Sequence, residues 1–172
     1  LKKNCIVGNA LVDMYAKCGE LTKARVIFDE LPVQTVVSWT VLITAYIEHG
    51  HDEDALDFFE QMQPRGLLPD AFTFVCGLKA CGNIGYAYKG QQLHAAITRE
   101  RLLERNNIVG NALLGMYAKC GMLSKAKEVF DELFDHDIFS WTSLMTGYTQ
   151  YGHDIEAENC FKRLQLEGLI NC

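Results

Sequence analysis

The 172-residue sequence lacks long apolar runs and contains only three prolines. No apolar segment approaches the length that spans a bilayer, and the first residues lack the basic-then-apolar profile of a signal peptide. We therefore expect no membrane association. The sequence begins with Leu rather than Met, and we expect a fragment that lacks any targeting segment of its parent.

Motifs of a metal, cofactor or catalytic site are also missing. The seven cysteines form no C-x-x-C pair, so we expect buried thiols in a reducing compartment. There is no Gly-rich phosphate loop. His51-Asp52-Glu53 matches half of a zinc deaminase signature, but the P-C-x-x-C segment is absent and residues 153–155 lack the Glu. We expect no enzymatic activity and no cofactor.

Basic residues are few. The chain has 16 Lys and Arg against 22 Asp and Glu, for a net charge of −6. This balance opposes general polyanion binding, because the affinity of proteins for phosphate comes from clustered Lys and Arg. Apolar residues, in contrast, make up 49% of the chain, which is ample for a buried core.

The most informative feature present is an internal repeat. Residues 7–19 read VGNALVDMYAKCG, and residues 109–121 read VGNALLGMYAKCG. At this shift of 102 residues, segments 6–68 and 108–170 are identical at about half of their positions. The chain is therefore an array of related units.

Apolar spacing within each unit is helical. It predicts hairpins of helices over 9–18 and 21–31, over 38–50 and 52–66, and over 72–81 and 88–103, the last with a longer loop at 82–87. Gly19 and Pro32 end the first two helices, and Ser38 is the expected N-cap of the third. Hairpins four and five repeat the first two. Since one hairpin cannot bury its apolar face alone, stacking into an all-α fold, an α-solenoid, is predicted.

Several strings resemble the pentatricopeptide repeat family in its plant-type variant, where short, standard and long motifs alternate. They are VGNALVDMYAKCG, VVSWTVLITAYIEHG, LLPDAFTFVCGLKACG and KGQQLHAAI. The resemblance implies a right-handed superhelix of about five helix-turn-helix repeats, at 5–35, 36–70, 71–106, 107–137 and 138–172. It also implies single-stranded RNA as the ligand, one base per repeat. Its setting would be RNA editing or processing in a mitochondrion or chloroplast, with editing-factor protein partners.

In this family each base is read by one residue of the first helix together with the last residue of the repeat. Carried over, the reading pairs are Asn9 with Thr35, Thr40 with Asp70, Val75 with Asn106, Asn111 with Asp137, and Thr142 with Cys172. An amide both donates and accepts, a hydroxyl leaves room for a purine, and a carboxylate only accepts, which favours guanine and uracil. The implied RNA preference is pyrimidine–G–any–U–purine.

The resemblance also implies side chains that wedge between bases and side chains that contact phosphate. The wedging residues are Ile6, Val37, Phe72, Ile108 and Phe139. Stacking on bases would suit such apolar side chains, but they could instead be hydrophobic staples that precede the helix N-caps. Lys17 and Lys119 match the phosphate position, which Glu48, Asn83 and Gln150 occupy in the other repeats.

A second interpretation is a protein-interaction scaffold that has little or no affinity for RNA. Lys and Arg clustered along the groove would favour RNA, whereas a neutral or acidic groove with an exposed apolar edge would favour a protein partner. In either case the outermost hairpins lack polar caps, so we expect self-association through the ends of the array.

Overall fold

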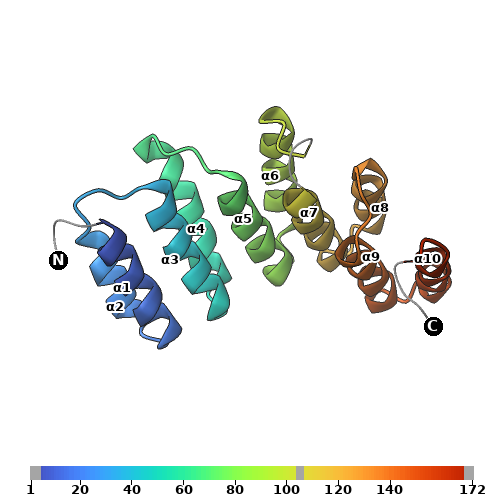
Figure 1. Ribbon diagram of the computed structural model, residues 1–172, viewed down its shortest axis with the longest axis horizontal. Helices are drawn as coiled ribbons and strands as arrows, with labels where there is room; N and C mark the ends of the chain where they lie inside the picture. Colours follow the sequence, from blue (N-terminus) through green and yellow to red (C-terminus); the bar gives the residue numbers. More distant parts are fainter. Residues whose placement is uncertain (1–4, 104–106, 169–172) are drawn as a thin grey trace. The chain divides into compact units, whose positions relative to one another are not determined.

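The structure is a computed structural model that describes residues 5–103 and 107–168. This part of the chain contains ten α-helices, one short 3-10 helix and no strand (Figure 1). The α-helices are α1 (Cys5–Lys17), α2 (Leu21–Asp29), α3 (Val36–Glu48), α4 (Asp52–Met62), α5 (Ala71–Ile84), α6 (Ala87–Arg99), α7 (Asn107–Lys119), α8 (Leu123–Glu132), α9 (Ile138–Gln150) and α10 (Asp154–Leu166). The 3-10 helix η1 (Gln63–Arg65) follows α4. The predicted all-α repeat fold is confirmed.

The chain forms two compact units, Leu1–Ala80 and Cys81–Cys172. In the first unit, α1 pairs with α2, α3 pairs with α4, and α1 packs on α3. Trp39 is fully buried. Its ring contacts Phe28 of α2 at a centroid distance of 4.9 Å and lies 6.4 Å from Phe58 of α4. One indole therefore joins two successive hairpins.

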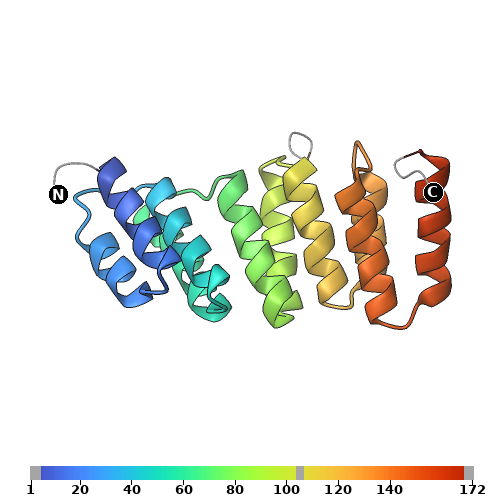
Figure 2. The same cartoon turned by 60° about the horizontal axis from the view of Figure 1, so that its bottom comes forward.

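The second unit repeats this packing. Helix α6 packs on α7, α7 pairs with α8, α9 pairs with α10, and α7 and α9 lie side by side (Figure 2). Trp141 occupies the place of Trp39, with its ring 4.6 Å from Phe130, and its Nε1 donates to Glu167 Oε2 at 3.1 Å. His94 is half-buried, and its Nδ1 lies 2.9 Å from the Tyr117 hydroxyl. The His94 side chain thus belongs to the packing between α6 and α7.

The turn between α5 and α6 is shorter than predicted. Helix α5 continues to Ile84 and ends at Gly85, where φ is 69° and the Tyr86 N–H donates to the Cys81 carbonyl at 2.8 Å. Gly82, which the predicted loop placed outside the helix, lies inside it. A Cβ there would approach Met116 Cα within 3.3 Å. Gly82 therefore permits close packing and does not end the helix.

The predicted N-cap of α3 is also wrong. Thr35, not Ser38, caps the helix: the Thr35 hydroxyl accepts from the Ser38 N–H at 3.3 Å, and Ser38 Oγ accepts from the Thr35 N–H at 3.1 Å. This reciprocal capping box starts the helix at Val36. The first helix of every hairpin begins where a repeat is predicted to begin, at residues 5, 36, 71, 107 and 138.

The cysteines only partly follow the expectation of buried thiols. Cys76, Cys81 and Cys160 are buried, and burial raises the pKa of Cys81 to about 12. Cys18 is exposed, because it lies in the turn between α1 and α2, outside the packed face of α1. Residues 5–103 and 107–168 contain no group of three or more His, Cys, Asp or Glu side chains that could hold a metal ion. None of the helices in these ranges is long and apolar enough to cross a membrane.

Candidate nucleic-acid interface

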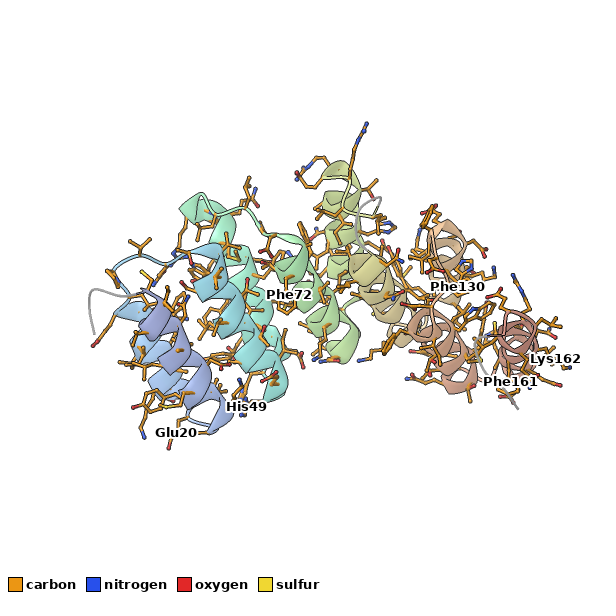
Figure 3. All side chains as sticks on the ribbon, in the orientation of Figure 1. Glu20, His49, Phe72, Phe130, Phe161 and Lys162 are labelled. Atoms are coloured by element: carbon orange, nitrogen blue, oxygen red, sulfur yellow. The ribbon has the colours of Figure 1, made fainter. Side chains whose placement is uncertain are left out.

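The predicted reading and wedging residues occupy constant positions in the first helices. The predicted first readers are the fifth residues of their helices: Asn9, Thr40, Val75, Asn111 and Thr142. The predicted wedging residues are the second residues and are exposed: Ile6 (80%), Val37 (59%), Phe72 (60%), Ile108 (63%) and Phe139 (71%). Figure 3 labels Phe72 on α5. A hydrophobic staple precedes the N-cap, whereas Val37 and Phe139 follow the caps Thr35 and Asp137, so that alternative is wrong for these two residues.

A cavity of about 270 Å³ in the first unit brings one predicted reading site together. Its lining includes the predicted readers Thr40 and Asp70 and the predicted wedges Val37 and Phe72. Thr40 and Asp70 are thirty residues apart in the sequence, and they meet because α5 begins beside α3. An apolar pair that flanks two hydrogen-bonding side chains is an arrangement that can hold a planar base.

Thr40 and Asp70 are linked through Thr73. Asp70 Oδ1 accepts hydrogen bonds from the Thr73 N–H and the Thr73 hydroxyl, each at 2.8 Å. Thr73 Oγ1 in turn lies 2.9 Å from Thr40 Oγ1, and the Thr40 hydroxyl also reaches the Val36 carbonyl at 2.8 Å. Thr73 was not among the residues predicted for the site. The available signal was its place three residues after Asp70, the spacing of a helix cap.

The second unit brings Asn111 and Asp137 together. Asn111 Nδ2 donates to Asp137 Oδ2 at 2.9 Å. Asp137 is the N-cap of α9, and its Oδ1 accepts from the Ser140 N–H at 2.8 Å. Asn111 Oδ1 is buried and has no hydrogen-bond partner in the described part of the chain. Beyond this bond, the pair can offer a ligand the Asn111 Oδ1, the second N–H of Asn111 Nδ2 and free lone pairs of the Asp137 carboxylate.

A further cavity in the second unit, of about 190 Å³, repeats the lining of the first. In both units the second, fifth, sixth, ninth, tenth and thirteenth residues of a first helix contribute. In α3 these are Val37, Thr40, Val41, Thr44, Ala45 and Glu48, and in α9 they are Phe139, Thr142, Ser143, Thr146, Gly147 and Gln150. The hollow is thus a property of the repeat.

The other predicted pairs are less complete. Thr35 is occupied as a helix cap, and the buried Asn9 Oδ1 has no hydrogen-bond partner in residues 5–103 or 107–168. Val75 is partly exposed and has no hydrogen-bonding side chain. The exposed Thr142 hydroxyl donates to the Ile138 carbonyl at 2.6 Å. Asn106 and Cys172 lie outside the described residues.

Lys17 and Lys119 have the same position but different surroundings. Lys17 Nζ lies 2.7 Å from Asp13 Oδ2; the hydrogen bond and charge of Asp13, with a smaller contribution from Glu48, raise the pKa of Lys17. Lys119 Nζ instead donates to Asn83 Oδ1 at 2.8 Å, because Gly115 stands where Asp13 stands in the first unit. Lys119 therefore has a neutral partner, and no ion pair forms at this amine within residues 5–103 and 107–168.

All the charged side chains that line the first cavity are acidic. Asp13, Glu48 and Asp70 all line it. No carboxylate lines the corresponding cavity of the second unit, where Lys119 contributes instead. Two hollows of the same construction thus differ in the sign of their charge.

Comparison with known proteins gives consistent matches along the chain. The PPR repeat family matches residues 34–83, and the PPR repeat matches residues 9–34, 111–138 and 139–169. In Arabidopsis thaliana, the pentatricopeptide repeat-containing protein At4g18520, chloroplastic, is 37% identical over 98% of this chain and 27% of its own length. The mitochondrial relative At1g06140 is 31% identical over 99% of this chain and 30% of its own length. The chain thus spans less than a third of these relatives.

Solved structures show the same fold. The crystal structure of the pentatricopeptide repeat protein PPR10 in complex with an 18-nt psaJ RNA element matches with a TM-score of 0.79 and 17% identity, over 98% of this chain and 26% of that chain. PPR10 from maize matches with a TM-score of 0.76. At this identity the likeness concerns the fold alone.

Proposed function

Because the chain belongs to the pentatricopeptide repeat family, we propose that it binds single-stranded RNA in a sequence-specific manner, with one base at each repeat. The observation that carries the proposal is the pairing of side chains distant in sequence. Thr40 and Asp70 line one cavity, and Asn111 contacts Asp137 at 2.9 Å. Support also comes from PPR10, a protein of the same fold that was crystallised with RNA.

Thr40 and Asp70 suit guanine. The Asp70 carboxylate can only accept hydrogen bonds, so it favours a base edge that carries N–H groups. The small Thr40 side chain leaves space for the larger purine ring. The exposed side chains of Val37 and Phe72 flank the same cavity, where they can stack on the base faces.

Asn111 and Asp137 suit uracil. One N–H of the Asn111 amide already donates to Asp137, so the oxygen acceptors of the pair and the second Asn111 N–H remain for a ligand. Uracil offers an N–H at ring position 3, whereas cytosine presents a lone pair there. Acceptors that face a lone pair repel it, and the buried acceptor would stay unsatisfied. The full preference that we propose is pyrimidine–G–any–U–purine, with binding rather than catalysis as the activity.

The cellular setting is part of the proposal. Relatives are named chloroplastic and mitochondrial, and we propose an organellar protein of the variant with alternating short, standard and long motifs. RNA editing or processing, together with protein partners from that machinery, follows from the same resemblance. Self-association through the ends of the array also stays a prediction, consistent with the exposed Leu166 and Ile155 on α10.

The acidic cavity of the first unit favours a second candidate, a scaffold for a basic protein segment. Three carboxylates line that cavity beside the apolar Val37 and Phe72. Lys17 is already paired with one of them, Asp13. A cationic peptide would meet complementary charge there, whereas an RNA phosphate close to Asp13 or Glu48 would be repelled.

Fluorescence anisotropy with labelled RNA distinguishes the two functions. The chain is titrated at several salt concentrations into pyrimidine–G–any–U–purine RNA and into variants with G changed to C or U changed to A. We expect micromolar affinity for the matched RNA and a loss of about tenfold for each change, the effect of one well-made base contact. Equal affinity for all three, or no binding, would reject sequence-specific recognition and leave the scaffold as the better account.

A further inference from the structure

Thr73 connects the two proposed base readers of the first unit without lining their cavity. Its side chain is fully buried, and it is absent from the residues that line the hollow. We propose that Thr73 is a positioning residue: it fixes the direction of the Thr40 hydroxyl proton and so sets the preference of this site for a base edge that donates two hydrogen bonds. This inference rests on the proposed RNA-binding function.

The proton of Thr73 has a clear destination. The hydroxyl has one hydrogen and two acceptors within reach, Asp70 Oδ1 at 2.8 Å and Thr40 Oγ1 at 2.9 Å. A bond to an ionised carboxylate is about twice as strong as one between neutral groups. Thr73 therefore donates to Asp70 and turns a lone pair toward Thr40.

The direction of the Thr40 proton follows from this. Thr40 Oγ1 has two protein acceptors, Thr73 Oγ1 at 2.9 Å and the Val36 carbonyl at 2.8 Å. If Thr40 donated to Val36 alone, lone pairs of two hydroxyl oxygens would face each other. The Thr40 proton is therefore shared between the Val36 carbonyl and Thr73 Oγ1, and Thr73 passes its own proton to Asp70. The Thr40 proton then points into the protein, and a Thr40 lone pair faces the cavity.

The cavity consequently offers acceptors from both readers. One is the Thr40 lone pair, and the other is Asp70 Oδ2, which makes no hydrogen bond in the described part of the chain. Guanine has two adjacent donors, the ring N1–H and the 2-amino group. Adenine and cytosine place an acceptor nitrogen beside one amino group, and uracil has a single N–H between two carbonyls. To donate to an adenine nitrogen, Thr40 would have to give up its bonds to Thr73 and to the Val36 carbonyl.

The second unit supplies an internal comparison. Ser140 is the third residue of α9, as Thr73 is of α5, but its hydroxyl donates to the Asp137 backbone carbonyl at 2.8 Å. Asn111 reaches the Asp137 carboxylate directly. Of these two sites, only Thr40–Asp70 has a relay through a hydroxyl, and Ser140→Ala is a matched control.

Thr73→Val removes the relay and keeps the shape. Valine has nearly the same form, Asp70 keeps its bond from the backbone N–H of residue 73, and Thr40 keeps the Val36 carbonyl. The Thr40 proton is then held by Val36 alone, and it can turn toward a ligand at the cost of that one bond, with the bond between Asp70 and the backbone N–H intact. We expect the preference for guanine over adenine to fall about fivefold, the effect of one neutral hydrogen bond. Thr73→Ser restores the hydroxyl and should restore the preference.

The test measures the affinity of the 172-residue chain for pyrimidine–G–any–U–purine RNA with guanine, inosine or adenine at the second base. Inosine lacks the 2-amino donor. For the wild type, Thr73→Ser and Ser140→Ala, we expect the RNA with guanine to bind most tightly and the RNA with adenine least tightly. For Thr73→Val we expect smaller differences in affinity between the three RNAs. If Thr73→Val melts at a clearly lower temperature than the wild type, Thr73→Cys replaces it in the test. Its thiol is a weak donor, so the differences in affinity between the three RNAs should be smaller than those of the wild type but should not vanish.

The outcomes separate this inference from the proposed function. A wild-type chain that binds the three RNAs equally overturns sequence-specific reading at this site, and the relay with it. A wild-type chain that discriminates, with a Thr73→Val chain that discriminates equally well, overturns the relay alone. The relay is also overturned if Ser140→Ala reduces the differences in affinity between the three RNAs as much as Thr73→Val does, since Ser140→Ala leaves the Thr40–Thr73–Asp70 chain intact.

Discussion

Asp137 is both the N-cap of α9 and a proposed base reader, so its substitution should change folding stability as well as binding. One carboxylate oxygen accepts from the Ser140 N–H at 2.8 Å, and the other accepts from Asn111 Nδ2 at 2.9 Å. Asp137→Ala removes both bonds. Asp137→Asn keeps an oxygen for the cap, and the Asn111 amide can rotate so that its unpaired Oδ1 accepts from the introduced amide.

The two substitutions should therefore lower the folding stability by different amounts. Loss of an N-cap costs about 1 kcal/mol, and loss of the partner of the Asn111 amide costs about 1 kcal/mol more. We therefore expect Asp137→Ala to lower the free energy of unfolding by about 2 kcal/mol, which lowers the melting temperature of a chain this long by about 4–8 °C. Asn caps helices about as well as Asp, so Asp137→Asn should cost less than about 1 kcal/mol.

Thermal unfolding followed by circular dichroism measures both changes. Asp70→Ala serves as the matched variant in the first unit, because Asp70 accepts from the N–H of Thr73 in the same way. A melting temperature for Asp137→Ala equal to that of the wild type, or equal to that of Asp137→Asn, would refute the assignment of this carboxylate as a helix cap.

Two further predictions concern charge. Lys119→Gln should reduce the slope of log affinity against log salt concentration by about 0.7, the contribution of one phosphate on a single strand. Lys17→Gln should leave this slope unchanged, because Asp13 already pairs with Lys17. RNA-binding titrations at several salt concentrations measure both slopes. Burial lowers the pKa of His94 in the folded state. The unfolded chain therefore binds a proton at this residue more readily than the folded chain does. Consequently, the folded state loses stability as pH falls below the ordinary histidine pKa of about 6.5. Urea unfolding of wild type and His94→Gln at about pH 7.5 and 5.5 should show a smaller pH effect in the variant, and an equal effect in both would contradict this.

The general fold could be predicted because the array repeats its own signals. Helical apolar spacing and Gly19 gave the first hairpin, and the shift of 102 residues transferred it to the fourth. The errors arose where one residue type serves two purposes. Gly82 suggested a loop, but its small size serves packing against Met116. Ser38 suggested an N-cap, but it is the third-residue partner of Thr35 in a capping box.

For the candidate site, the sequence could predict which residues take part but not which contacts their side chains make. The resemblance placed the proposed readers and wedges, and these fall at constant places in the first helices. The partners of these side chains depend on contacts between segments far apart in the chain. Thr73 reaches Thr40 across 33 residues, and Lys119 reaches Asn83 across 36 residues. The pairing of Lys17 with Asp13 is different, because four-residue spacing on a helix allows it to be predicted locally.

The proposal that paired side chains read each base is best tested by exchanging the base preference of one pair. In the wild type, Asn111 donates to Asp137, and the oxygen acceptors of the pair suit the N–H at ring position 3 of uracil. In Asp137→Asn the rotated Asn111 amide presents an N–H, which suits the lone pair at ring position 3 of cytosine. Anisotropy of both proteins with RNAs that carry U or C at the fourth base measures the change. We expect the preference to shift from uracil toward cytosine. Equal weakening of both RNAs, with the preference unchanged, would contradict it.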